Sequence, residues 1–271
     1  MEKKTPNELI KYAINNNIGT IAITDHDTID GLKNIDYSDK TIINSGINII
    51  NGIELSSKVD KGTMHILGYN IDINNKKLND KISELKNINI NYIILLLAQI
   101  NKDYNIKFSS DDIKNVINSI GNIGRPDIAK LCIKYGYAES VQDAFDKYLI
   151  SAFDKIRNIK ETLNYQECLN LIFESGGIPV LAHPKTLKLN ENELTELIEK
   201  MVQCGLKGIE VYHSTHSITE INLYLKIAQK YNLLISGGSD YHGKISKPDV
   251  EIGTGINNNL NIKKLSLLNH I

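Results

Sequence analysis

The sequence predicts an α/β fold in which a mostly parallel sheet is covered by helices. Two observations lead to this prediction. Short apolar runs rich in β-branched residues alternate with helical patterns, and polar side chains follow the ends of several of these runs. Parallel strands need long crossover connections, usually helices, so a regular alternation of strand and helix is typical of a parallel sheet.

The predicted strands are short runs dominated by Ile, Val and Leu. They cover residues 20–24, 47–55, 64–71, 178–183, 208–212 and 233–240. Helical patterns that end near Gly or Asn cover residues 161–175, 191–204 and 217–231. A further helix is predicted to begin after Thr5, which can cap it, with Pro6 in its first turn.

Residues 75–157 interrupt this alternation, because their patterns indicate helices alone. We therefore expect two parts. Residues 1–74 and 158–271 form a strand–helix part, and residues 75–157 form a helical insertion. An insertion that carries a ligand-binding residue over a site in the other part would act as a substrate lid.

Charge and cysteine content limit the classes of partner and compartment. The chain carries 31 Lys and Arg against 32 Asp and Glu, which argues against long nucleic acids and against membrane binding through a basic tail. Short nucleotides remain compatible with this balance. The cysteines Cys132, Cys168 and Cys204 lie far apart and indicate reduced thiols in a cytoplasmic protein. The sequence does not predict an oligomeric state.

Side chains that can bind metals gather at or near the ends of the predicted strands. They are Asp25, His26, Asp27, Glu54, His65, His183, Glu210, His213, His216, Asp240 and His242. Six of the seven histidines of the chain belong to this group. Because the carboxyl ends of parallel strands lie on one face of such a fold, we expect these side chains to meet in one site.

A mixture of imidazole and carboxylate donors suits Mn, Fe or Zn, whereas Ca prefers oxygen donors alone. Such metals activate a bound water and stabilise the attacking and leaving oxygens of phosphoryl transfer, so we expect a metal-bound water rather than a protein nucleophile. Structural roles are the alternative. Asp25 and Asp27 could cap the next helix, and Asp240 could be a turn residue after a Gly-Gly pair.

Arg125 is a candidate phosphate ligand outside the strand ends. It directly precedes Pro126, which suits the first turn of a helix, and an arginine beside free backbone N–H groups binds phosphate well. The alternative is an ordinary surface arginine paired with Asp127 or with another nearby acid. His216 could supply a second phosphate contact, or could cap the helix that follows residue 217.

Seven motifs occur in order between about residues 5 and 255: AITDHDTIDG, GIELS, HILGYNID, IGRPDIAK, GGIPVLAHP, GIEVYHSTHS and SGGSDYHG. Together they resemble the polymerase and histidinol phosphatase (PHP) superfamily. The branch that they resemble is that of small phosphoesterases, which includes nucleoside 3',5'-bisphosphate and 5'-monophosphate phosphatases. The resemblance implies a distorted (β/α)7 barrel with an all-helical insertion and a cluster of up to three divalent metals.

The resemblance also implies roles for individual residues. The implied metal ligands are His26, Glu54, His65, His183, Asp240 and His242. His26 and His242 would share one metal, and Glu54 would bridge two others, one completed by His65 and His183 and the other by Asp240. Arg125 and His216 match phosphate-binding positions. The residues expected to support the ligands are Asp25, Asp27, Glu210 and His213.

The chain departs from the family pattern at its start. Family members open with a strand of the form Asp-Leu-His-x-His followed by Ser-Asp-Gly, whereas this sequence begins at the helix that follows. We therefore expect a barrel that lacks its first strand and has an open edge. The interpretation that we favour is a start placed too far downstream or a chain cut at its beginning. The alternatives are a true fragment with weak or no activity and a chain repurposed for binding a metal or a nucleotide.

The sequence thus predicts a metal-dependent phosphoesterase that hydrolyses a small phosphate monoester. The expected substrate is a nucleotide, either a nucleoside 5'-monophosphate or a 3',5'-bisphosphate. One alternative is a truncated, weakly active or inactive module that binds a metal or a nucleotide. Another is a nuclease that acts on short oligonucleotides, although the near-zero net charge favours small substrates.

Overall fold

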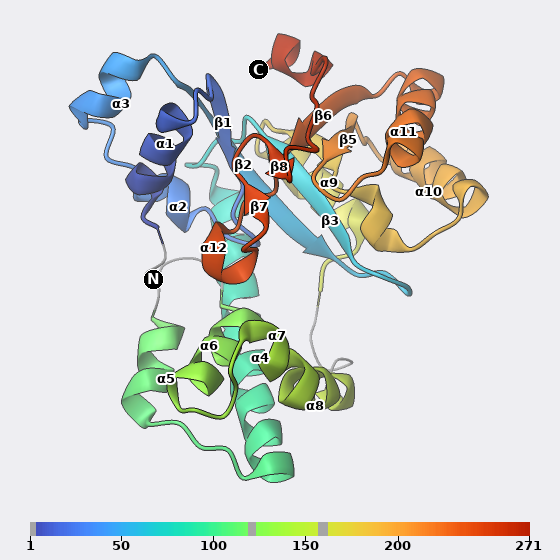
Figure 1. Ribbon diagram of the computed structural model, residues 1–271. Helices are drawn as coiled ribbons and strands as arrows, with labels where there is room; N and C mark the ends of the chain where they lie inside the picture. Colours follow the sequence, from blue (N-terminus) through green and yellow to red (C-terminus); the bar gives the residue numbers. More distant parts are fainter. Residues whose placement is uncertain (1–3, 119–122, 157–161) are drawn as a thin grey trace. The chain divides into compact units, whose positions relative to one another are not determined.

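The computed structural model describes residues 4–118, 123–156 and 162–271, and the chain divides into two compact units. The first unit contains Met1–Asp80 and Leu163–Ile271, and the second contains Lys81–Thr162. The division expected at residues 157–158 lies outside the described residues. Figure 1 shows the sheet with its helices in the first unit and helices in the second.

One six-stranded sheet, in the order β1-β2-β3-β4-β5-β6, is the framework of the first unit and curls like half of a barrel (Figure 1). Its strands are β1 (Thr20–Ile23), β2 (Asn48–Ser57), β3 (Met64–Tyr69), β4 (Ile178–Leu181), β5 (Gly208–His213) and β6 (Leu234–Gly238). The predicted α/β class is confirmed. Each strand end lies within two residues of its expected position.

The third strand departs from the mostly parallel arrangement. β3 runs antiparallel to β2 and to β4, whereas the β1–β2, β4–β5 and β5–β6 pairs are parallel. Residues 58–63, which connect β2 to β3, are too few for the crossover that a parallel pair needs. The reversal brings His65, near the start of β3, to the edge where β2 ends.

Helices and short elements complete the first unit. They are α1 (Pro6–Asn15), α2 (Asp30–Lys33), α3 (Lys40–Ser45), α9 (Tyr165–Glu174), the 3-10 helix η3 (Pro184–Leu187), α10 (Glu191–Gln203), α11 (Ile218–Tyr231), α12 (Gly243–Ser246), the hairpin strands β7 (Val250–Glu251) and β8 (Gly255–Ile256), and η4 (Ser266–His270). α9 packs against β2, β3 and β4, and α11 packs against β5 and β6.

The first helix begins as its sequence predicts. The Thr5 side chain accepts a hydrogen bond from the Glu8 N–H, and the Glu8 carboxylate accepts one from the Thr5 N–H at 2.7 Å. This reciprocal pair satisfies two N–H groups that the helix itself cannot, and Pro6 needs no partner.

Buried aliphatic side chains hold the sheet to its neighbours. Ile50, Leu67, Val180 and Leu267 belong to one core cluster. Each fully buried side chain of this kind contributes about 1.5–3 kcal/mol. A Cβ atom at Gly68 would lie 2.9 Å from the Ile172 side chain, so glycine lets α9 approach β3 closely.

The second unit has its own core. Its elements are α4 (Lys76–Tyr104, which begins in the first unit), α5 (Ser110–Ile117), α6 (Arg125–Lys134), α7 (Val141–Ala144), the π-helix η1 (Phe145–Leu149) and α8 (Ile150–Ile156). Leu96, Ile100, Ile128 and Leu149 are among its fully buried side chains. Across the described residues, no helix combines the length and apolar character needed to cross a membrane.

Candidate metal centre

The loop after β1 places His26 beside β2. The Glu54 N–H donates to the Asp25 carbonyl at 3.1 Å, and the Asp27 N–H donates to the Glu54 carbonyl at 2.9 Å. These bonds extend the parallel pairing past the end of β1 and put His26 opposite Glu54. Side chains of paired residues lie on the same face, so the imidazole and the carboxylate become neighbours.

Asp27 fixes this loop through its side chain. Its carboxylate accepts hydrogen bonds from the Ser56 N–H at 2.7 Å and from the Ser56 hydroxyl at 2.8 Å. Its backbone adopts φ +52°, a left-handed conformation that a turn into the next element requires. Asp27 therefore anchors the segment that carries His26 to the strand that carries Glu54, and its expected contact with a His ligand stays a prediction.

Two imidazoles from different segments meet at one oxygen of the Glu54 carboxylate. Oε1 of Glu54 lies 2.8 Å from Nδ1 of His65 and 2.9 Å from Nε2 of His183, and these two nitrogens are 3.3 Å apart. Glu54 lies diagonally across the β2–β3 pair from His65, because Ser56 is the residue that pairs with His65. With His26, whose Nε2 is 3.7 Å from Oε2, these residues form what we call the Glu54 cluster.

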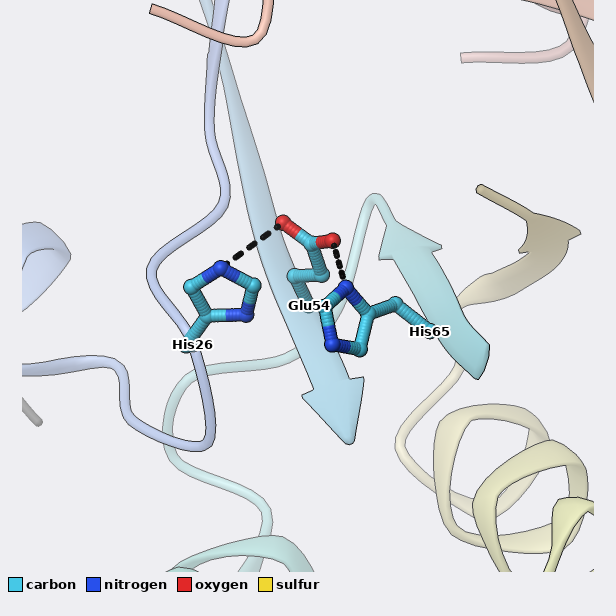
Figure 2. A group of neighbouring side chains, drawn as sticks. All are labelled: His26, Glu54 and His65. Carbon is cyan, nitrogen blue, oxygen red and sulfur yellow. Dashed lines mark ion pairs between the residues drawn. The ribbon is translucent and has the colours of Figure 1, made fainter. Parts of the chain in front are cut away.

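Figure 2 shows His26, Glu54 and His65 pointing toward one another from the β1 loop, β2 and β3. One donor atom from each of the three lies within 4.8 Å of the others. The sheet is thus folded so that strand ends far apart in the sequence place their donors in a single space.

A second group surrounds Asp240, at the turn after β6. Oδ1 of Asp240 lies 3.2 Å from Nδ1 of His242, and Oδ2 lies 3.2 Å from Nε2 of His213. The Lys247 ammonium also contacts Oδ2. We call Asp240, His213, His242 and Lys247 the Asp240 cluster. Nε2 of His242 lies 3.4 Å from Nε2 of His26, so the two clusters adjoin.

The nitrogen–nitrogen separations fit shared metal coordination. Metal–nitrogen distances of about 2.0–2.1 Å and tetrahedral angles put two ligand nitrogens roughly 3.3 Å apart. The His26–His242 separation is 3.4 Å and the His65–His183 separation is 3.3 Å. The Nδ1–H of His242 donates to the Asp240 carbonyl at 2.9 Å, which leaves Nε2 as the donor atom for a cation.

Burial and opposing charge set the ionisation of the Glu54 cluster. Burial disfavours the Glu54 carboxylate, but the charges and hydrogen bonds of His26, His183 and His65 outweigh burial and hold its pKa well below the ordinary value. Burial likewise opposes protonation of His183, yet Glu54 raises the pKa of His183 to about 9. A carboxylate held ionised among imidazoles is the environment that a divalent cation would enter.

Glu210 holds the turn that carries His183. The His183 N–H donates to Oε2 of Glu210 at 2.8 Å, and His183 adopts φ +22°. Burial raises the pKa of Glu210. The His183 ring is held on its other side by Thr186, whose Oγ1 lies 3.0 Å from Nδ1. The position of the His183 imidazole is therefore defined by backbone and side-chain contacts together.

His216 is buried beside the Asp240 cluster. Its Nδ1–H donates to the Val211 carbonyl at 2.9 Å, and among the described residues Nε2 has no hydrogen-bond partner. Burial lowers the pKa of His216 to about 4, so the ring is neutral near pH 7 and Nε2 carries a lone pair. To donate a hydrogen bond to a phosphate, Nε2 would have to carry a proton, which requires either a charged ring or loss of the Nδ1–H bond to the Val211 carbonyl. Ser217, not His216, caps α11.

Arg125 lies in the second unit, at the first position of α6. Its guanidinium is centred 4.1 Å from the Phe153 ring. The Asp127 carboxylate accepts the Gly124 N–H at 3.0 Å and contacts the Lys130 ammonium at 3.2 Å. The phosphate-binding role of Arg125 stays a prediction.

Two residues of the site were not expected from the sequence, Lys247 and Thr186. Thr186 follows the His-Pro pair at a helical spacing, which could have indicated its contact with His183. Lys247 lies five positions after His242 in a chain rich in lysine, so no sequence signal distinguishes it.

Comparisons with known proteins find similar chains that are named as enzymes acting on phosphate esters, although no protein-family model matches the chain. A 5'-3' exoribonuclease from Escherichia coli is 28% identical over 252 residues, which cover 92% of this chain and 83% of the relative. A 3',5'-nucleoside bisphosphate phosphatase from Chromobacterium violaceum is 25% identical and covers 88% of this chain and 82% of the relative. A crystal structure from Bifidobacterium adolescentis, provisionally described as a metal-dependent phosphoesterase, superimposes with a TM-score of 0.76 at 25% identity, over 93% of this chain and 87% of that one.

Proposed function

We propose, from the premise that this chain is a phosphoesterase of the polymerase and histidinol phosphatase (PHP) superfamily, that it hydrolyses phosphate monoesters of nucleotides. The substrates that we propose are nucleoside 5'-monophosphates or 3',5'-bisphosphates. The cofactor that we propose is a divalent ion, with Mn, Fe and Zn as the candidates that imidazole and carboxylate donors suit.

One observation carries the proposal. Imidazoles from three separate segments (the β1 loop, β3 and the turn after β4) converge on the Glu54 carboxylate of β2, at distances between 2.8 and 3.7 Å. Burying several imidazoles and a carboxylate together costs free energy unless they are paired or bind a cation. A cluster of this composition is expected where a metal is held.

We assign a separate role in this reaction to each group of residues. Glu54, His65 and His183 would hold one cation, and His26 with His242 would hold another. A divalent cation at these donors would supply an activated water and positive charge for the phosphate oxygens. Asp27 and Glu210 fix the segments that carry the ligands, and Arg125 would bind the phosphate through its guanidinium.

A second candidate reaction is the removal of nucleotides from a short RNA. The similarity to the Escherichia coli 5'-3' exoribonuclease over 92% of this chain favours it. The two reactions break a phosphate ester with the same metal chemistry, so the metal centre alone does not separate them. Whether the substrate is a mononucleotide or an RNA end depends on which of them can reach the metal centre and on how its phosphate is bound.

The test is a product screen with the purified chain and Mn, Fe or Zn. Nucleoside 5'-monophosphates, 3',5'-bisphosphates and a short 5'-phosphorylated oligoribonucleotide are incubated in parallel, with His183→Ala as the control. Release of inorganic phosphate from mononucleotides supports the proposal. Release of nucleotides from the oligonucleotide alone supports the second candidate. Bound metal without turnover of any substrate would identify a binding module instead.

A further inference from the structure

Lys247 contributes a positive charge to the site, and no role discussed so far uses it. Its ammonium contacts Oδ2 of Asp240, whose side chain is 16% exposed. The same carboxylate oxygen lies 3.2 Å from Nε2 of His213, and the other oxygen lies 3.2 Å from Nδ1 of His242. Both oxygens of Asp240 therefore already face donors that belong to the chain.

The hydrogen-bond direction at His213 follows from its other nitrogen. The Thr215 N–H donates to Nδ1 of His213 at 3.1 Å, so Nδ1 is an acceptor. In the neutral ring the proton then resides on Nε2, which donates to Oδ2 of Asp240. With this bond and the Lys247 contact, Oδ2 has engaged both of its lone pairs. A cation can bind this oxygen only if one of the two donors leaves.

Lys247 is the donor that can leave. His213 is almost completely buried and its ring is fixed by Thr215, whereas the Lys247 side chain is 38% exposed. The ammonium sits at the end of a flexible stem and can move into water. The backbone of Lys247 stays in place, because its N–H donates to the Gly243 carbonyl at 3.0 Å and its own carbonyl accepts the Val250 N–H at 3.2 Å.

In the Glu54 cluster, unlike the Asp240 cluster, the groups that contact the carboxylate need not leave when a cation binds. Among the described residues, the nitrogen atoms that contact the Glu54 carboxylate belong to the imidazoles of His26, His65 and His183. An imidazole nitrogen can itself be a metal ligand in the same position. A lysine cannot, because its ammonium has three donors and no acceptor.

We propose that Lys247 is an internal competitor of the metal at Asp240, which makes the cation position at Asp240 weaker and more exchangeable than the position in the Glu54 cluster. The ammonium occupies Oδ2 when no cation is present and withdraws when a cation binds. This inference rests on the metal centre proposed above. It concerns metal affinity and is independent of which phosphate ester is hydrolysed.

Metal titration tests the inference without reference to activity. Mn²⁺ is titrated into the metal-free full chain, and free Mn²⁺ is measured by electron paramagnetic resonance. The wild type is compared with Lys247→Met, which keeps most of the stem, and with Lys247→Arg, which keeps the charge. The matched control is Lys185→Met. Lys185 contacts Oε2 of Glu220 at 3.1 Å and the Thr215 carbonyl at 2.8 Å.

We expect two classes of Mn²⁺ site in the wild type, with the weaker class tightened by up to about fivefold in Lys247→Met, the upper end of the effect of an exposed ion pair. Lys247→Arg and Lys185→Met should keep the wild-type affinities. Unchanged or weaker binding in Lys247→Met would overturn the inference, as would an equal gain in Lys185→Met, which would indicate a general charge effect. Failure of every variant and of the wild type to bind Mn²⁺ would instead contradict the metal centre itself.

Discussion

Oε1 of Glu54 lies 2.9 Å from Nε2 of His183, although the two residues are 129 positions apart in the sequence. Their contact joins β2 to the turn that follows β4. In the sheet, β3 lies between β2 and β4. Any change at Glu54 therefore acts on several segments of the site at once.

Glu54→Gln preserves the shape of this side chain and removes its charge. We expect it to reduce bound metal and to lower kcat/KM by about a hundredfold or more, because the carboxylate is central to the proposed ligand set. Metal content by elemental analysis and phosphate release measure the two effects. The control is Glu174→Gln, which removes a carboxylate from an exposed pair with Lys77. A Glu54→Gln protein with the full metal content of the wild type would contradict the ligand assignment.

The pKa of His183 predicts a pH effect on the metal-free protein. Its folded-state pKa is raised to about 9 from an ordinary value of 6.5. The raised pKa contributes stability that is fully present below pH 6.5 and is lost as pH rises through 9. In the presence of EDTA, the urea midpoint of the wild type should therefore fall between pH 6.5 and 9 more steeply than that of His183→Asn. Parallel curves for the two proteins would refute this coupling between His183 and Glu54.

Much of the site could be predicted because strand ends are visible in the sequence. Buried runs of β-branched residues mark the strands, and a polar residue just beyond such a run is conspicuous, as at His26, His183 and Asp240. The orientation of β3 was harder to predict from the sequence, because it depends on the short connection formed by residues 58–63 and not on the strand pattern. His65 reaches the site because β3 is reversed, not because the sheet is parallel throughout.

Contacts made by long flexible side chains could not be predicted from sequence patterns. Lys247 meets Asp240 because the backbone turns at α12 and returns past the end of β6. No residue type or spacing in the sequence predicts this path of the backbone. The support that Asp27 gives through Ser56 was hidden for a similar reason, because it depends on which strand lies next to the β1 loop.

Arg125→Ala tests the proposed phosphate contact in the second unit. We expect KM to rise by about tenfold or more with metal content unchanged, because a guanidinium–phosphate pair is charge-assisted and can be bidentate. Arg125 also packs on Phe153, so circular dichroism must show that the helices remain folded. The control is Lys134→Ala in the same helix, which removes an exposed charge paired with Asp112. Full activity of Arg125→Ala would remove this residue from the substrate site.

Gly31→Ala tests whether the loop before α2 holds His26 in place through Asp25. A Cβ atom at position 31 would lie 2.0 Å from Oδ2 of Asp25, so the carboxylate must move. Alanine is the better helix former by about 1 kcal/mol, and helix propensity alone would therefore stabilise the variant. We expect the opposite, a loss of about 1–3 kcal/mol in the free energy of unfolding, as overpacking produces.

Gly19→Ala is the matched control, because a Cβ atom at Gly19 meets nothing within 4 Å. Urea unfolding of the two metal-free variants measures the difference in stability, and Mn²⁺ titration of the folded proteins measures the effect on His26. Displacement of Asp25 should weaken Mn²⁺ binding in Gly31→Ala, since Asp25 precedes His26 and its carbonyl accepts the Glu54 N–H at 3.1 Å. Equal stability and equal Mn²⁺ affinity in the two variants would show that the Asp25 side chain has no part in positioning the ligand.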